Sequence, residues 1–244
     1  DNADVVCHGE GHVALLTAWL RSPAQFETTF AMESFIDELA AAAGRDPLAF
    51  RLAYLKDPRA LAVLRAAADL YGWKGRPARA SGESQGKLAH GRGIAWVNRD
   101  DSRVAAIADV TVNRDSGQVL VKRVVVAHDC GQVINPDGLR NQIEGNVIQA
   151  TSRALKEEVC FDSTHITSRD WQGYPILKFS EMPEVEIVLL DRPDQPPVGA
   201  GEPATVVTAP AIANAIANAT GARLREVPFT PARVRAALAE VILP

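Results

Sequence analysis

The chain has 244 residues, of which 47% are hydrophobic and 23% charged, and its formal net charge is −4. A chain of this size can bury a sizeable core. Its mild acidity argues against a nucleic-acid interface or an anionic membrane surface as the partner, and no apolar run approaches the roughly 20 residues that a transmembrane helix requires.

The first third of the chain predicts three consecutive amphipathic helices. The first is expected at residues 32–43, with Thr28 or Thr29 as its cap and Gly44 as its end. Its apolar residues recur at helical spacing and define the expected buried face: Phe35, Ile36, Leu39 and Ala43. Asp46-Pro47 and Asp57-Pro58 each predict a further helix with proline in the first turn, and the third helix ends near Gly72.

After a stretch rich in Gly, Ser, Arg and Pro, the pattern becomes that of β-structure. Residues 105–112 and 119–126 alternate in polarity around a turn at 113–117, which predicts a β-hairpin. Further helices are expected at 137–154, 209–220 and 230–242, and short strands at 158–161 and 185–190. This order of elements favours an α+β fold over regular βαβ alternation. We divide the chain into a helical subregion (1–75), a linker (76–88) and an α+β subregion (89–244).

Three cysteines, Cys7, Cys130 and Cys160, stand far apart without a Cys-x-x-Cys pair. This spacing predicts no disulfide framework and no zinc or iron–sulfur site. We expect each of them to be an ordinary buried thiol.

The segment around Glu202 is the strongest candidate for chemistry. Gly199 and Gly201 permit backbone conformations and close approaches that other residues do not, and Pro203 fixes the turn that follows. A carboxylate held on such a loop, ahead of a helix of small residues, suits a positioned general base. The alternative is a surface loop with an incidental glutamate.

Two other segments offer weaker signals. Gln142 follows a strand-to-helix junction at His128-Asp129-Cys130-Gly131, and its amide could hydrogen-bond the edges of a pterin ring; alternatively it is solvated, and Asn135 or Asp137 only caps the helix. Arg21 precedes the first helix and suits an anionic or electron-rich ligand, although an ordinary surface arginine fits equally. His128 alone is more typical of a structural histidine than of a ligand.

Taken in order, these segments resemble the molybdopterin-binding large subunit of the molybdenum hydroxylase (xanthine dehydrogenase/aldehyde oxidase) family. The resemblance is closest to its bacterial branch of isoquinoline oxidoreductase, nicotinate dehydrogenase and membrane-linked aldehyde dehydrogenase β subunits, and it covers nearly the whole chain as the C-terminal part of such a subunit. The motifs that carry it are Arg21-Ser22-Pro23, Glu33-Ser34-Phe35-Ile36-Asp37-Glu38-Leu39-Ala40, Gly44-Arg45-Asp46-Pro47-Leu48-Ala49-Phe50-Arg51, Asp129-Cys130-Gly131, Asn135-Pro136, Gln142-Ile143-Glu144-Gly145 and Gly201-Glu202-Pro203.

The resemblance implies that Glu202 is the catalytic glutamate beside molybdenum and that Gln142 reaches the pterin, with Gly199 and Gly201 also at the cofactor. Arg21 matches an arginine near the metal, but xanthine-type members continue with Gly-Phe-Gly where this chain has Ser22-Pro23-Ala24. No metal ligand is assigned to the chain. We expect Gln142 and the Glu202 loop to converge, and a desolvated pocket to raise the pKa of Glu202.

The implied reaction is hydroxylation of an N-heteroaromatic compound or oxidation of an aldehyde, with water as the oxygen source. Glu202 would deprotonate the attacking hydroxyl, and electrons would leave through [2Fe–2S] clusters on a partner chain or a missing region. The implied cofactor is molybdopterin in its cytosine dinucleotide form. The implied partners are the remainder of the large subunit, an iron–sulfur subunit and a small-molecule substrate. A bacterial periplasmic or inner-membrane-associated location is favoured over the cytoplasm.

Because upstream cofactor motifs are absent from this sequence, we expect the chain alone to lack activity and stoichiometric molybdenum and to expose apolar surface. One alternative is an inactive relative that serves as an assembly or binding module, since a fold does not imply an activity. Another is an unrelated hydrolase-like domain that uses Glu202 and His128, although no serine or cysteine nucleophile motif supports it.

Overall fold

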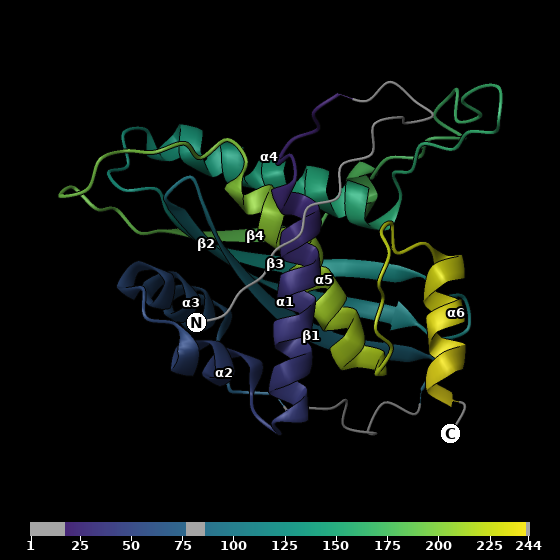
Figure 1. Cartoon of the computed structure of the whole chain (residues 1–244), viewed down its shortest axis with the longest axis horizontal. Coiled ribbons are helices and arrows are strands. Elements are labelled where there is room, and N and C mark those ends of the chain that lie inside the picture. The colour runs from purple at the N-terminus through teal and green to yellow at the C-terminus, as the bar shows by residue number, and fades with distance from the viewer. Residues whose placement is uncertain (1–17, 77–85, 243–244) are drawn as a thin grey trace.

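The computed structural model describes residues 18–76 and 86–242, and within them six α-helices and a four-stranded sheet form the α+β fold that the sequence predicts (Figure 1). The strands are β1 (Leu88–Arg99), β2 (Ser102–Asn113), β3 (Val119–Asp129) and β4 (Glu184–Leu189), in the order β1-β2-β3-β4. β2 pairs antiparallel with both β1 and β3, and β4 runs parallel to β3.

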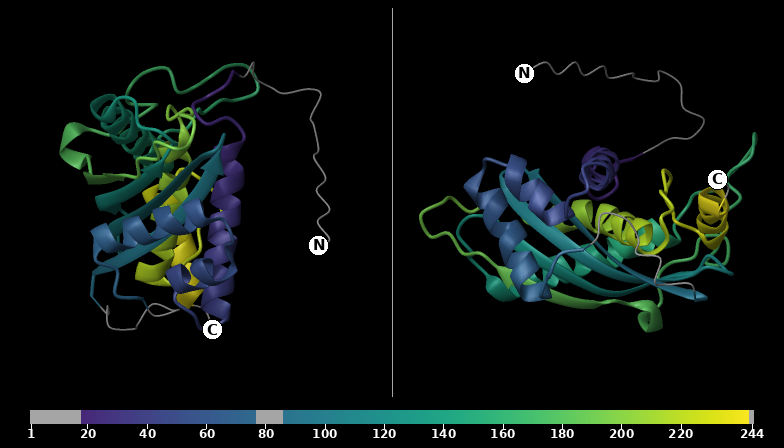
Figure 2. Two further views of the ribbon diagram at one scale, coloured as in Figure 1. Left: turned by 90° about the vertical axis from the view of Figure 1, so that its left-hand side faces the viewer. Right: turned by 90° about the horizontal axis from the view of Figure 1, so that it is seen from below.

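Helices cover both faces of this sheet (Figure 2). Because side chains alternate along a strand, Ala105 and Ile107 pack with α3 (Pro58–Tyr71) on one face, while Val104 and Ala106 belong to the larger core on the other face. That larger core also takes in α5 (Pro203–Thr220), α4 (Pro136–Leu155) and part of α1 (Gln25–Ala42). The remaining helices are α2 (Pro47–Tyr54), α6 (Pro231–Ile242) and a short 3-10 turn at Phe179–Glu181.

The predicted hairpin is confirmed as β2 and β3, but the strand before it was missed. β1 contains Gly91 and Gly93, and glycine is depleted in strands. Here the glycines serve packing. A Cβ atom at either position would lie only 2.2 Å from a backbone oxygen of α5. The alanine-rich helix α5 therefore rests its backbone directly on β1.

The first helix differs from its prediction in both extent and orientation. α1 begins at Gln25, its N-cap residue Ala24 makes no side-chain capping bond, and Thr28 instead donates to the Ala24 carbonyl at 2.9 Å. The expected apolar face was also wrong, since Phe35 is 56% exposed. The buried side instead carries Glu33 and Asp37 along with Phe26, Phe30, Thr29 and Ser34.

Arginines from other elements account for these buried carboxylates. Glu33 pairs with Arg51 of α2 at 2.9 Å, both side chains being almost fully buried, and Asp37 pairs with Arg76 and Arg223. A buried charge is tolerated when it is paired and hydrogen-bonded. Hydrophobic periodicity alone predicts that the apolar side of α1 is buried. The arginines that pair with the carboxylates on the other side lie far away in sequence, so the periodicity does not reveal them.

Other boundaries follow the sequence closely, with a few corrections. Asp46 and Asp57 cap α2 and α3 with their side chains, as the Asp-Pro pairs predict, and Asn135, one of the two caps considered, caps α4. α5 begins at Pro203 rather than at residue 209, and it accommodates Pro210. The strand predicted at 158–161 reduces to one isolated bridge between Phe161 and Ile166.

The cysteine expectation holds in part. Cys130 is buried, Cys160 is exposed rather than buried, and Cys7 lies outside the described residues, as does most of the predicted linker. The domain boundaries stay a prediction.

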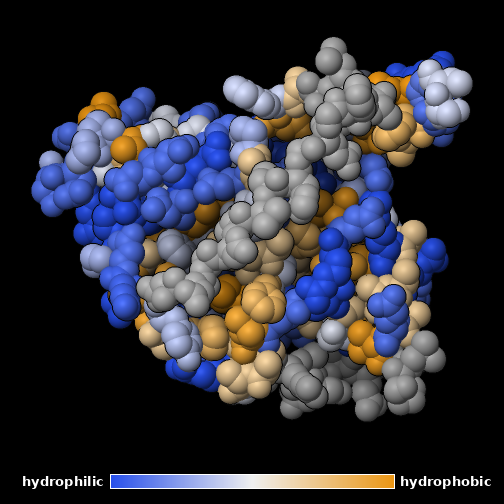
Figure 3. Space-filling view, viewed as in Figure 1, coloured by the Kyte–Doolittle hydropathy of each residue, from blue (hydrophilic) through white to orange (hydrophobic). Residues whose placement is uncertain are grey.

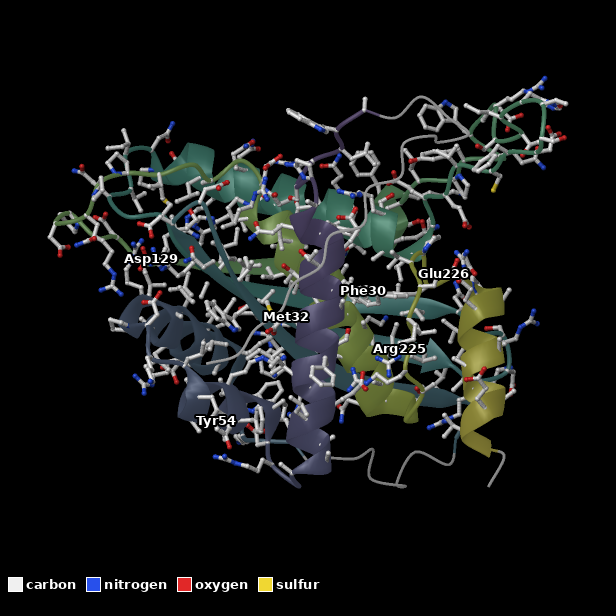
Figure 4. The ribbon with its side chains drawn as sticks, viewed as in Figure 1. Phe30, Met32, Tyr54, Asp129, Arg225 and Glu226 are labelled. Carbon is white, nitrogen blue, oxygen red and sulfur yellow. The ribbon has the colours of Figure 1, made fainter. Side chains whose placement is uncertain are left out.

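Apolar side chains remain uncovered on α1. Phe35, Met32 and Leu39 are exposed, and Phe30 lies on another side of the helix, turned towards Arg225 and Glu226 (Figure 4). Figure 3 shows patches of hydrophobic residues in the middle and lower part of this face, among hydrophilic ones. A helix that is apolar on more than one side normally contacts protein on more than one side. No helix among the described residues is long and apolar enough to cross a membrane.

Candidate functional site

Residues separated by 180 positions meet at the start of α5. Arg21 donates from Nε to the Gly201 carbonyl at 2.7 Å, and the backbone N–H of Ser22 donates to Glu202 Oε1 at 2.9 Å. The Ser22 hydroxyl also donates to the Glu202 carbonyl at 3.0 Å. The fold therefore brings together two of the three segments singled out in the sequence, and it uses hydrogen bonds to do so.

Ser22 and Ala24 adopt left-handed backbone conformations, with φ of 67° and 63°. Such a conformation costs about 1–3 kcal/mol for a residue other than glycine and tends to cluster at functional sites. Ser22 is the residue whose N–H meets the Glu202 carboxylate.

The Glu202 carboxylate is held from two sides. Oε1 accepts from Ser22 and Oε2 pairs with Arg99, the last residue of β1. The Ser22 N–H, Arg99 and the charge of Arg21 together lower the pKa of Glu202, against the opposing effect of partial burial. The expectation of a raised pKa is therefore wrong for this arrangement, because the side chain stays 35% exposed and faces a cation.

Gln142 lies in the second turn of α4, on the side that faces the Gly199–Glu202 loop. A Cβ atom on Gly201 would lie 3.9 Å from Gln142 Nε2. Both residues line a pocket of about 240 Å³ whose other walls come mainly from residues 130–139 and 197–200. The predicted convergence of Gln142 with the Glu202 loop is confirmed as geometry, although about 60 residues separate them.

Asn146, which no sequence motif indicated, joins the two segments. It is fully buried, donates to the Gly201 carbonyl at 3.3 Å and accepts from the Thr205 N–H at 3.1 Å. It thus adds a side-chain acceptor to an N–H group in the first turn of α5 that also donates to the Glu202 carbonyl at 3.0 Å. The available signal was its spacing of four residues from Gln142, which places both on one face of α4.

The Asp129-Cys130-Gly131 segment supports one wall of the pocket. Asp129 is fully buried and accepts from Arg59 of α3, from Arg192 at 3.1 Å and from the Gly131 N–H at 3.1 Å (Figure 4). The Cys130 carbonyl in turn accepts from the Val198 N–H at 2.9 Å. Asp129 therefore fixes the loop that carries one wall of the pocket.

His128 takes no part in this arrangement. Its ring is fully buried, and neither ring nitrogen has a hydrogen-bond partner among the described residues. Burial lowers its pKa to about 4. The Glu202 carboxylate meets Ser22 and Arg99 instead, so the structure gives no support to a hydrolase pair of Glu202 and His128. Among the described residues, no group of His, Cys, Asp and Glu side chains is arranged to hold a metal ion.

Comparison with known proteins agrees with the fold and the motifs. Residues 102–183 match the model of the molybdopterin cofactor-binding domain. The chain is 46% identical over 229 residues to the B subunit of nicotinate dehydrogenase from Pseudomonas putida, covering 91% of this chain and 19% of that protein. It is 35% identical over 215 residues to the beta subunit of isoquinoline 1-oxidoreductase from Brevundimonas diminuta, covering 88% and 27%.

Among solved structures, the aldehyde oxidoreductase of Desulfovibrio gigas matches with a TM-score of 0.75 at 17% identity, covering 91% of this chain and 42% of that one. At this identity the likeness concerns the fold alone. The match thus spans 19% and 27% of the lengths of the two curated relatives. From the domain match, the ordered motifs and the shared fold, the chain belongs to the molybdenum hydroxylase family of molybdopterin-binding oxidoreductases.

Proposed function

We propose that this chain is the part of a molybdopterin-dependent oxidoreductase that carries the catalytic base, Glu202. The observation that supports this most directly is the convergence of Gln142, Ala200 and Gly201 around one pocket, directly before Glu202 in the chain. We propose an N-heteroaromatic substrate rather than an aldehyde, because two similar relatives are named for nicotinate and isoquinoline. Water would supply the oxygen, and [2Fe–2S] clusters on other polypeptide would accept the electrons.

The pocket residues fit a ligand with hydrogen-bonding edges. The Gln142 side chain is exposed and makes no hydrogen bond within the described part of the chain, so its amide donor and acceptor are both available. The backbone N–H groups of Gly199, Ala200 and Gly201 likewise donate to no described residue. Amides near a helix N-terminus favour oxygen acceptors and anions. These groups suit the hydrogen-bonding edge of a pterin. We propose the cytosine dinucleotide form of the cofactor.

Each of these residues would have a distinct role. Gln142 and the Gly199–Gly201 amides would orient the cofactor, which supplies the redox chemistry when bound. Glu202 would accept the proton of the attacking hydroxyl, and its lowered pKa keeps it ionised and ready to do so. Arg21 would act through the Gly201 carbonyl that it holds, rather than by direct contact with the reacting atoms.

The alternative is an inactive relative that serves as an assembly or binding module. The exposed apolar residues of α1 are compatible with both the enzyme and the binding module, because each requires the chain to contact further polypeptide. The Glu202 arrangement favours the enzyme. A left-handed Ser22 and a largely buried Arg99 meeting one carboxylate form a costly structure that an assembly surface would not need.

Glu202→Gln in the complete enzyme tests the proposal. The substitution preserves size but removes basicity, and turnover per molybdenum should fall by at least ~10²-fold, as is typical of a lost general base. Molybdenum content should stay unchanged. Glu240→Gln, an exposed residue of α6, is the matched control and should leave turnover intact. Near-normal turnover of the Glu202 variant would refute the assignment.

A second experiment tests whether the cofactor site of this chain is incomplete. Expressed alone, the 244-residue chain should contain no stoichiometric molybdenum and should self-associate through exposed apolar surface. Metal analysis combined with light scattering would check both points. A monomeric, molybdenum-loaded and active chain would contradict this expectation.

A further inference from the structure

Arg99 lies at a strand end where the sheet fixes the backbone. It is the last residue of β1 and pairs in register with Ser102 across the turn formed by Asp100 and Asp101. Both turn residues are left-handed, with φ of 49° and 68°, as a tight two-residue hairpin turn requires. The position from which the Arg99 side chain leaves the backbone is therefore set by the sheet itself.

The guanidinium of Arg99 contacts Glu202, and its other nitrogens have partners of their own. Nη2 meets Glu202 Oε2, Nη1 donates to Gln25 Oε1 at 2.9 Å, and Nε lies 3.6 Å from the exposed Asp100 carboxylate. The side chain is only 13% exposed. Gln25 lies in the first turn of α1, immediately after the strained segment that supplies the Ser22 N–H.

We propose that Arg99 is a positioning residue for the proposed reaction, orienting the Glu202 carboxylate from the side opposite Ser22. This assignment rests on Glu202 being the base. It lies outside the residues that match the cofactor-binding domain model, which begin at 102, and outside every motif that the sequence suggested. The two contacts use one oxygen each, so lone pairs remain on both oxygens to accept a proton.

The charges around Glu202 distinguish Arg99 from the neutral groups beside it. Arg21 and Arg99 are the cations that act on it, while Ser22 contributes a neutral N–H and Gln25 contacts only Arg99. Without Arg99, the Oε2 side of the carboxylate loses its described partner, and the carboxylate is free to rotate about its remaining bond to Ser22. The pKa of Glu202 should then rise, since Arg99 is one of the groups that lower it.

Arg99→Met and Arg99→Lys in the complete enzyme test this, with kcat/KM measured per bound molybdenum across pH. In Arg99→Met, activity at acidic pH relative to the optimum should fall by roughly tenfold, since one paired charge commonly moves a carboxylate pKa by a unit or more. Arg99→Lys keeps the charge and should restore the acidic side of the profile. A wild-type pH profile in Arg99→Met overturns the proposal.

Arg103→Met is the matched control. Arg103 lies at the same end of the hairpin with similar exposure, at 12%, but pairs with Asp57 and Asp101 rather than with Glu202. It should leave the pH profile unchanged while sharing any general effect on hairpin stability. An equal shift in both variants would mean that the effect comes from the fold and not from Glu202, which also overturns the proposal.

A thermal double-mutant cycle gives a readout that is independent of turnover. The melting-temperature changes of Arg99→Met and Glu202→Gln should be non-additive, and those of Arg103→Met and Glu202→Gln additive. Additivity in the first pair refutes the contact. If Glu202→Gln retains turnover, the proposed base fails; if it is inactive while Arg99→Met keeps the normal profile, only the Arg99 assignment fails.

Discussion

The contact between β1 and α5 predicts a large effect for a very small change, Gly93→Ala. An added Cβ would lie 2.2 Å from the Ala211 carbonyl oxygen and 2.2 Å from the Ala215 amide nitrogen. Both are backbone atoms of α5, so no side chain can rotate aside. To reach an ordinary separation of 3.4 Å, helix and strand must move apart by about 1.2 Å.

The expected cost follows from two opposing contributions. Overpacking a well-packed core costs typically about 1–3 kcal/mol, and rigid backbone neighbours place this site at the upper end. Replacing glycine also restricts the unfolded chain, which returns about 0.4–1 kcal/mol. The net destabilisation should be about 2 kcal/mol, equivalent to a drop of about 4–8 °C in melting temperature for a domain of this size.

Thermal unfolding of the 244-residue chain at fixed concentration measures this directly. Gly86→Ala is the control, because that glycine precedes the same strand, has no left-handed φ and has no atom within 4 Å of an added Cβ. It should be neutral or slightly stabilising. Turnover of the complete enzyme should also fall in Gly93→Ala, since α5 begins directly after Glu202. Equal melting temperatures for the two variants would refute the backbone contact.

Three further changes test other parts of the structure. Arg51→Met leaves the buried Glu33 carboxylate without its cation and should cost about 3–5 kcal/mol in urea unfolding; a loss below about 1 kcal/mol would contradict the pair. Because the folded-state pKa of His128 is about 4, below its ordinary 6.5, the unfolded chain binds the extra proton, so stability should fall by up to ~3 kcal/mol as pH drops through that window, and His128→Leu should flatten the dependence. Gly201→Ala should lower bound molybdopterin without changing the melting temperature, because the new methyl group fills the space beside Gln142 with no clash; unchanged cofactor content would count against the pocket.

The sequence alone determined the elements whose signals are local. Each helix that follows an Asp-Pro pair begins where the pair predicts, because the cap and the proline act within one turn. The β2–β3 hairpin was equally predictable from alternation and a short turn. The motifs also sufficed to indicate the family and to predict that Gln142 and the Glu202 loop would meet.

Only the tertiary structure decided which face of α1 is buried and how Glu202 is held. The buried side of α1 depends on arginines from α2, from residue 76 and from residue 223, which no local pattern connects to it. The partners of Glu202 are Ser22, 180 residues away, and Arg99, 103 residues away. Spacing within a sequence reports on periodicity along one element, whereas the ionisation of a carboxylate depends on charges within a few ångströms, and only folding brings those charges there.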